Sequence, residues 1–183
     1  MRSTLSQLRR ALSSPSSVAT SCSLSRDLRI NKGKVRRIIG ALERAEIVFR
    51  VPPIGPGRRR VRRPWKVYFA SSTLRWGQLM ELLPGFPIRS TLLEEAVAAR
   101  LRRMVLTTRR GDLVYGWKDG EVDLILEHER RLAFGVGLGK RSPMGQLSLA
   151  RRLGVDNTYV VTLRAGVFEE KGAIQIPAWL LLF

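Results

Sequence analysis

Cysteine, histidine and long apolar runs are scarce in this chain of 183 residues. The single cysteine, Cys22, excludes an internal disulfide framework and a cysteine-based zinc site. The single histidine, His128, is expected to be an exposed or strand-edge residue rather than a catalytic one. No apolar run reaches about 18 residues, and residues 1–17 contain no apolar segment of signal-peptide length. The sequence therefore predicts an intracellular, cytoplasmic protein without a membrane span.

Acidic residues are scarce in the first part of the chain. The protein has 33 lysine and arginine residues but only 15 aspartate and glutamate residues, which gives a net charge of +18. Through Trp76 there are 18 basic and 3 acidic residues, against 15 basic and 12 acidic residues in the remainder. Charge that served stability alone would be spread evenly with compensating acids. The asymmetry instead predicts two parts with different roles, the first binding a polyanion, because phosphate contacts release condensed counterions.

Residues 1–72 have the pattern of a winged helix-turn-helix domain. Apolar spacing predicts helices over 3–12, 23–30 and 31–47, with a turn-rich interruption over 13–22. Asn31 is expected to cap the third helix. Strand-like runs over 47–51 and 66–71 then flank a basic loop rich in proline and glycine. The expected core positions of the third helix are Val35, Ile38, Ile39, Leu42 and Ile47.

The basic residues of this domain lie where a winged helix contacts nucleic acid. A helix-turn-helix presents its recognition helix to the major groove, and cations in a wing suit a phosphate backbone or minor groove. DNA is expected in preference to RNA, and the alternative is a winged helix that docks on an acidic protein surface. The predicted nucleic-acid-binding residues are Lys32, Lys34, Arg36, Arg37, Arg58, Arg59, Arg60, Arg62 and Arg63.

Residues 73–183 change to an α/β pattern. A linking helix over 72–85 precedes an amphipathic helix over 90–105, whose expected capping box pairs Ser90 or Thr91 with Glu94. The expected elements that follow are strands over 112–118, 121–129 and 131–139, a helix from Ser142 to Gly154, a strand over 157–163, and a short terminal strand or turn over 173–183. This order predicts an α/β (α+β) domain with a mixed sheet flanked by helices.

The order of these elements is similar to that of the restriction-endonuclease-like nucleases, called PD-(D/E)XK after their motif. The resemblance implies a helix glutamate, a strand aspartate and a Glu-x-Lys on the next strand that together bind Mg²⁺ and orient water. Glu94 and Asp123 occupy the first two positions and are the candidate metal ligands. At the third position "FGVGL" places Gly135 and Gly137 where the glutamate and lysine would stand. The sequence therefore predicts a degenerate nuclease-like domain.

A migrated ligand is the alternative that would preserve catalysis. Asp123, Glu127 and Glu129 have even spacing, so they would share one face of a strand, and Lys140 lies just past the next strand. A retained nuclease would draw on Glu94, Asp123, Glu127 and Lys140 with Mg²⁺, whereas a binding protein needs no cofactor. Against this, a hairpin strand produces such a solvated carboxylate row without any function, and a glutamate is favoured near any helix N-terminus.

The stretch "AFGVGLGKRS" over 133–142 first suggests a nucleotide site because of its glycines. The phosphate-binding-loop motif does not fit. If Gly139 and Lys140 were its Gly-Lys pair, position 134 would have to be glycine and position 141 serine or threonine, but these positions hold Phe134 and Arg141. A dinucleotide fingerprint fails as well, because its third glycine would fall on Lys140. The following helix start, with Lys140 and Arg141, could still hold one phosphate of a nucleic acid.

The stretches "ALERAEIVFRVPPIGPGRRRVRRPWKVYF", "TLLEEAVAARL", "YGWKDGEVDLIL" and "IQIPAWLLLF" resemble the C-terminal half of a family of archaeal and bacterial AAA-type ATPases. In that family an ATPase domain is followed by a winged helix and a nuclease-like domain. No G-x-x-x-x-G-K-[ST] motif is present, so the ATPase domain is absent, and a standalone protein, a split gene and a fragment all remain open. The resemblance implies docking on a separate ATPase subunit beside nucleic-acid binding. Homodimerisation is expected on other grounds, because helix-turn-helix proteins often read paired half-sites.

Overall fold

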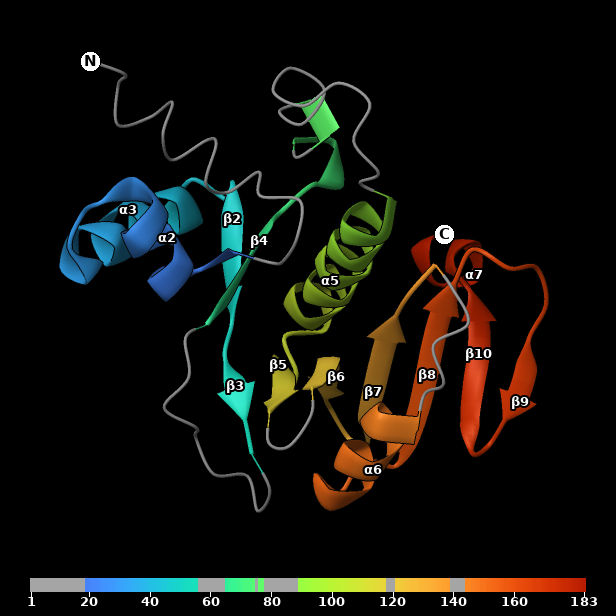
Figure 1. Cartoon of the computed structure of the whole chain (residues 1–183). Coiled ribbons are helices and arrows are strands. Elements are labelled where there is room, and N and C mark those ends of the chain that lie inside the picture. Colours follow the sequence, from blue (N-terminus) through green and yellow to red (C-terminus); the bar gives the residue numbers. More distant parts are fainter. Residues whose placement is uncertain (1–18, 56–64, 75, 78–88, 118–120, 139–143) are drawn as a thin grey trace.

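The computed structural model describes residues 19–55, 65–74, 76–77, 89–117, 121–138 and 144–183. A small sheet lies beside a large mixed sheet that is flanked by helices (Figure 1). Within these ranges, no helix is both long enough and apolar enough to cross a membrane. Three expectations lie outside the described residues: the helix over 3–12, the wing with Arg58 to Arg63, and the candidate Lys140.

The part of the chain that forms the small sheet contains two helices followed by two antiparallel strands, in the expected chain order. Its elements are β1 (Ala19–Thr20), α2 (Ser21–Leu28), α3 (Lys32–Arg44), β2 (Val48–Val51) and β4 (Lys66–Phe69). The strand order is β1-β4-β2, and β2 and β4 run antiparallel. The expected turn over 13–22 is wrong at its end, because residues 19–20 pair with β4 and α2 begins at Ser21.

Local signals in the sequence account for α3. The Asn31 side chain caps it as expected, accepting a hydrogen bond from the Lys34 backbone N–H at 2.7 Å. Val35 and Ile39 are buried, whereas Ile47 is 37% exposed and does not belong to the core. The difference arises because α3 ends at Arg44, so the helical period no longer applies at Ile47. The buried residues on this side of the small sheet are Leu24, Leu28, Val35, Ile39, Val48, Val67 and Phe69.

The large sheet contains the expected three-strand meander. Its strands are β3 (Pro53–Ile54), β5 (Asp112–Trp117), β6 (Glu121–Glu127), β7 (Arg131–Val136), β8 (Asn157–Thr162), β9 (Phe168–Glu170) and β10 (Ala173–Pro177), in the order β3-β5-β6-β7-β8-β10-β9. Strands β5, β6 and β7 are antiparallel, and β8 runs parallel to β7. Sequence patterns did not predict the short strands β3 and β9.

Helices cover both faces of the large sheet. One face packs against α5 (Arg89–Thr108) and α7 (Ala178–Leu182), and the other packs against α6 (Met144–Arg152). The capping box expected at Ser90 or Thr91 is wrong, because both residues lie inside α5. The terminal segment is also more regular than expected, since β10 is followed by a helical turn. Residues 72–74 and 76–77 are helical, in agreement with the expected linking helix.

The inner face of the small sheet packs against α5, so the two parts of the chain share a core. Phe49, Val51 and Tyr68 are buried with residues of α5 and the large sheet. Because successive side chains of a strand point to opposite faces, Lys66 lies on the same face as Tyr68. Strand β3 also pairs in parallel with β5. A domain boundary after residue 72 stays a prediction, and these contacts cross it.

Candidate functional site

Polar side chains from β4, α5, β6 and α6 meet beside the inner face of the small sheet. We call Lys66, Tyr68, Glu94, Glu121, Asp123 and Gln146 the Lys66 cluster. The Lys66 Nζ atom lies 3.4 Å from Glu94 Oε1 and 2.5 Å from Glu121 Oε1. It also donates a hydrogen bond to the Asp123 carbonyl oxygen at 3.5 Å, and the Tyr68 hydroxyl donates to Glu94 Oε1 at 2.8 Å. The fold thus brings the candidates Glu94 and Asp123 together around a lysine.

The Asp123 side chain is held by donors from the two following elements. Its Oδ2 atom accepts hydrogen bonds from the Val136 backbone N–H at 2.8 Å and from Gln146 Nε2 at 3.2 Å. Gly135 lies on the neighbouring strand, and a Cβ atom at this position would collide with the Gln146 amide oxygen. The amide of α6 therefore fills the space that a side chain at Gly135 would occupy.

Burial and neighbouring charges shift the pKa of three of these groups. Burial works to lower the pKa of Lys66, but the Glu94, Glu121 and Asp123 carboxylates together outweigh it, so the pKa is raised. Burial, followed by the Glu94 charge, raises the pKa of Asp123 from 3.8 to about 6. Burial and Glu94 also raise the pKa of Tyr68 well above its ordinary value. Lys66 is therefore a charged group and the Tyr68 hydroxyl keeps its proton.

The residues of the Lys66 cluster do not fit the Mg²⁺ ion that the nuclease resemblance implies. Mg²⁺ requires about six oxygen ligands in near-octahedral geometry. Gly135 supplies no oxygen from its side chain, and Gln146 turns its N–H donor toward Asp123. The ammonium of Lys66 already contacts Glu94 and Glu121. Among the described residues, no group of three or more Asp, Glu, His or Cys side chains could hold a metal ion.

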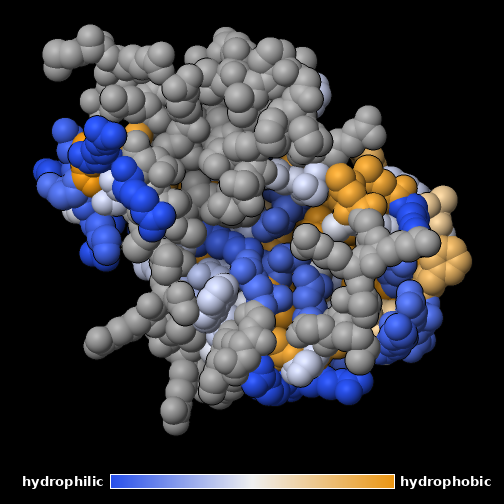
Figure 2. Space-filling model, viewed as in Figure 1, coloured by the Kyte–Doolittle hydropathy of each residue, from blue (hydrophilic) through white to orange (hydrophobic). Residues whose placement is uncertain are grey.

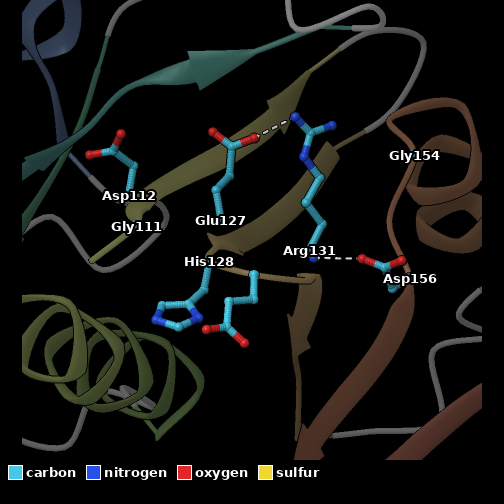
Figure 3. Close-up of a pocket in the computed structure, with 8 residues that line it drawn as sticks. Gly111, Asp112, Glu127, His128, Arg131, Gly154 and Asp156 are labelled. Carbon is cyan, nitrogen blue, oxygen red and sulfur yellow. Dashed lines mark hydrogen bonds and ion pairs between the residues drawn. The ribbon is translucent and has the colours of Figure 1, made fainter. Parts of the chain in front are cut away.

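Glu127, at the end of β6, and Glu129, just beyond it, line a separate polar pocket of about 480 Å³ (Figure 3). Glu127 pairs with Arg131 at 2.7 Å, and the Arg131 backbone N–H donates to Asp156 Oδ2 at 2.6 Å. Glu129 is exposed and lies 3.7 Å from Arg110. His128 lines the same pocket and is exposed, which confirms its expected position. The structure therefore does not bring Glu127 or Glu129 to the Lys66 cluster.

Irregular alternation along β6 explains this separation. Leu124 and Leu126 pack on the α5 side of the sheet, whereas Val122 and Ile125 pack on the α6 side. The pairing of β5 with β6 shifts its register between Val114 and Gly116. A strict two-residue period therefore does not extend from Asp123 to Glu127, and their even spacing does not place them on one face.

A second candidate site is the exposed surface of the first half of α3. Lys32, Lys34, Arg36 and Arg37 are all exposed, and Figure 2 shows a hydrophilic surface over this helix. The first turn of α3 contains no acidic residue. Within the described part of the chain, no carboxylate forms an ion pair with any of these four side chains. We call these four residues the α3 basic face.

Sequence reasoning missed Lys66, Tyr68, Glu121 and Gln146. A signal was present for the first two, because Lys66 and Tyr68 alternate with apolar residues in a strand that is buried on both faces. A buried strand that carries polar side chains on one face indicates a polar partner for that face. Gln146 gives no such signal, since its contact with Asp123 depends on how α6 packs across the sheet.

Comparison with known proteins finds an archaeal relative. No family model matches the chain, and no solved structure matches it significantly. The uncharacterized protein MJ1637 of Methanocaldococcus jannaschii is 30% identical over 137 residues, which are 72% of this chain and 28% of that protein. The chain therefore spans less than a third of the length of the curated relative that it matches.

Proposed function

We propose that this chain is a nucleic-acid-binding protein, with DNA preferred to RNA, that contacts its ligand through a winged helix-turn-helix domain. The observation that carries the proposal is the α3 basic face. Its four cations are exposed, whereas Val35 and Ile39 of the same helix are buried against α2 and the small sheet. A recognition helix needs this arrangement, with one face anchored in the core and the other free to enter a groove.

The placement of these cations favours a ligand over a purely structural role. A helix N-terminus carries a partial positive charge, so cations in its first turn are unfavourable by about 0.3–1 kcal/mol each at low ionic strength. Lys32 and Lys34 lie in the first turn of α3, and no acid there compensates them. A phosphate group would neutralise both the lysines and the helix terminus. The expected wing cations, Arg58 to Arg63, would extend the same contact along the backbone.

The Lys34→Ala/Arg37→Ala variant tests this proposal. We expect it to weaken binding of a fluorescent DNA duplex, and to reduce the slope of log K against log salt by about two, one unit for each lost phosphate contact. Fluorescence anisotropy at several salt concentrations gives both quantities. The matched control is Arg103→Ala/Arg164→Ala, which removes the same charge from exposed residues of α5 and of the turn after β8.

Three outcomes of the same titration would count against the proposal. Equal losses of DNA affinity in the test variant and the control would show that the net charge of the protein attracts DNA without a specific site. No binding of duplex DNA, single-stranded DNA or RNA by the wild-type chain at low salt would favour docking on an acidic protein surface. Cleavage of the DNA with Mg²⁺ or Mn²⁺, abolished by Asp123→Ala, would favour the alternative of a metal-dependent nuclease.

For the second part of the chain we propose a nuclease-like scaffold with a role in binding rather than catalysis. The element order α5-β5-β6-β7-α6-β8 supports the nuclease-like assignment, because a helix, an antiparallel meander, a helix and a parallel strand follow one another as expected. Two contacts support the loss of catalysis: Lys66 binds the Glu121 carboxylate, and Gln146 binds the Asp123 carboxylate. Homodimerisation and docking on a separate ATPase subunit stay predictions.

A further inference from the structure

We propose that Lys66 is an internal cation that replaces the divalent metal ion in this nuclease-like site and closes the site to metals. The proposal goes beyond nucleic-acid binding, because it assigns a role to a residue of β4 within a site formed by α5 and β6. It rests on the contacts of Lys66, on the arrangement around Asp123, and on the position of the lysine in the fold.

The contacts of Lys66 are those of a counter-ion. Its ammonium is buried, and it reaches the Glu94 and Glu121 carboxylates and the Asp123 carbonyl oxygen. A buried ammonium without such partners would strongly destabilise the fold. The three acids would likewise repel one another without a positive charge between them. The lysine and the acids therefore require each other, as a metal ion and its ligands do.

The surroundings of Asp123 complete the exclusion of metal. Its Oδ2 atom already accepts hydrogen bonds from Val136 and Gln146, so a metal ion would have to compete with two donors for this oxygen. Gly135 gives Gln146 the room to do this, since any side chain there would displace the amide. The three residues thus act together. Gly135 leaves room for Gln146, whose amide binds the Asp123 carboxylate, and Lys66 binds the Glu94 carboxylate.

The position of Lys66 explains how the cation reaches the site. Strand β4 belongs to the small sheet, and its inner face places Lys66 and Tyr68 over the N-terminal half of α5. The lysine ammonium also lies 5.1 Å from the centroid of the Tyr115 ring on β5, close enough for a cation–π interaction. The cation of the site is thus supplied by the part of the chain that carries the α3 basic face.

Replacement of the lysine tests the proposal. Lys66→Met keeps the apolar stem but leaves Glu94 and Glu121 without their counter-ion, and we expect this variant to bind Mn²⁺ at least about tenfold more tightly than wild type. The readout is paramagnetic broadening of the backbone amide signals of Tyr68, Asp123 and Val136 during a titration with Mn²⁺. In the wild-type chain we expect no selective broadening of these signals at millimolar Mn²⁺.

Two controls separate this effect from a general change of charge. Lys171→Met removes a charge from an exposed lysine that lies 3.9 Å from Glu170, and it should leave the signals of the cluster sharp. Lys66→Met/Glu94→Gln should lose the gained affinity. Selective broadening in wild type as strong as in Lys66→Met would overturn the proposal, and so would a folded Lys66→Met that binds no Mn²⁺. Should Lys66→Met not fold, the wild-type titration and the milder variant Lys66→Gln decide the question.

Discussion

At the scale of single residues, Asp123 shows how neighbouring groups set the charge of a buried carboxyl group. Lys66 of β4, Glu94 of α5 and Glu121 of its own strand act on its charge, while Val136 and Gln146 hold its oxygen. Burial and the two glutamates favour the protonated acid, and the lysine and the backbone hydrogen bond favour the carboxylate. The balance gives a group that titrates near neutral pH within a lysine-bridged cluster.

The first prediction concerns this titration. NMR of the Asp123 side-chain carboxyl carbon should give a pKa of about 6, compared with an ordinary value of 3.8. Glu94→Gln should lower this pKa, because the Glu94 charge raises it, and Lys66→Met should raise it further. Between about pH 4 and pH 6 the folded chain binds more protons at this site than the unfolded chain. The contribution of Asp123 to the free energy of unfolding therefore falls as the pH rises through this window and is constant above it.

A pKa of Asp123 near its ordinary value would contradict the buried, acid-rich surroundings. A pKa that did not respond to Glu94→Gln would place Glu94 too far away to act on Asp123. Either result would weaken the geometry on which the role of Lys66 depends.

At the scale of elements, the sequence predicted the helices and strands that depend on local interactions. The spacing of Val35 and Ile39 and the cap at Asn31 define α3, and the meander follows from three β-rich runs separated by turn residues. The strands β3 and β9 could not be predicted, because two or three residues carry no period and form a strand only through their partners. The resemblance to the nuclease order of elements predicted that Glu94 and Asp123 lie together. Lys66 and Gln146 could not be predicted in this way, because tertiary packing brings them to the cluster.

The glycines of β7 and its end allow a matched test of that packing. Gly135→Ala should lower the free energy of unfolding by about 0.5–1.5 kcal/mol, because the new methyl group displaces the end of the Gln146 side chain and removes its hydrogen bond to Asp123. Gly137→Ala is the control, since no atom lies within 4 Å of a Cβ atom there, and its effect should stay within about 0.5 kcal/mol. Urea denaturation measures both.

A double-mutant cycle then identifies the cause. If Gln146 is the obstacle, Gly135→Ala should cost less in a Gln146→Ala background than in wild type, because the clash has already been removed. Additive effects of the two substitutions, or equal effects of Gly135→Ala and Gly137→Ala, would show that Gln146 does not fill this space.

At the scale of the whole molecule, the two parts of the chain differ in charge but share their core. Helix α5 packs against the large sheet and against the inner face of the small sheet, where Phe49 and Tyr68 stack at 5.6 Å between ring centroids. Strand β3, which closely follows β2 in the chain, pairs with β5 and so belongs to the large sheet. The α3 basic face lies on the other side of the small sheet, away from α5 (Figure 1). A ligand on α3 would therefore leave the shared core and the Lys66 cluster undisturbed.

The shared core predicts that both parts unfold together. Glu95 is buried on α5, and its Oε1 atom accepts a hydrogen bond from the Phe69 backbone N–H of β4 at 2.8 Å. Glu95→Ala deprives that buried N–H of this acceptor, which should lower the free energy of unfolding by about 1–3 kcal/mol. Because the contact joins the small sheet to α5, which packs on the large sheet, amide protection should fall in β2 and β4 and in β5 to β7 alike, within a single cooperative transition. Hydrogen exchange followed by NMR measures this strand by strand.

The control Glu169→Ala, on the exposed strand β9, should change the amide protection of neither set of strands. Loss of protection confined to β2 and β4 would instead show that residues 1–72 fold as a separate domain, with the Lys66 cluster as a weak contact between two independent units.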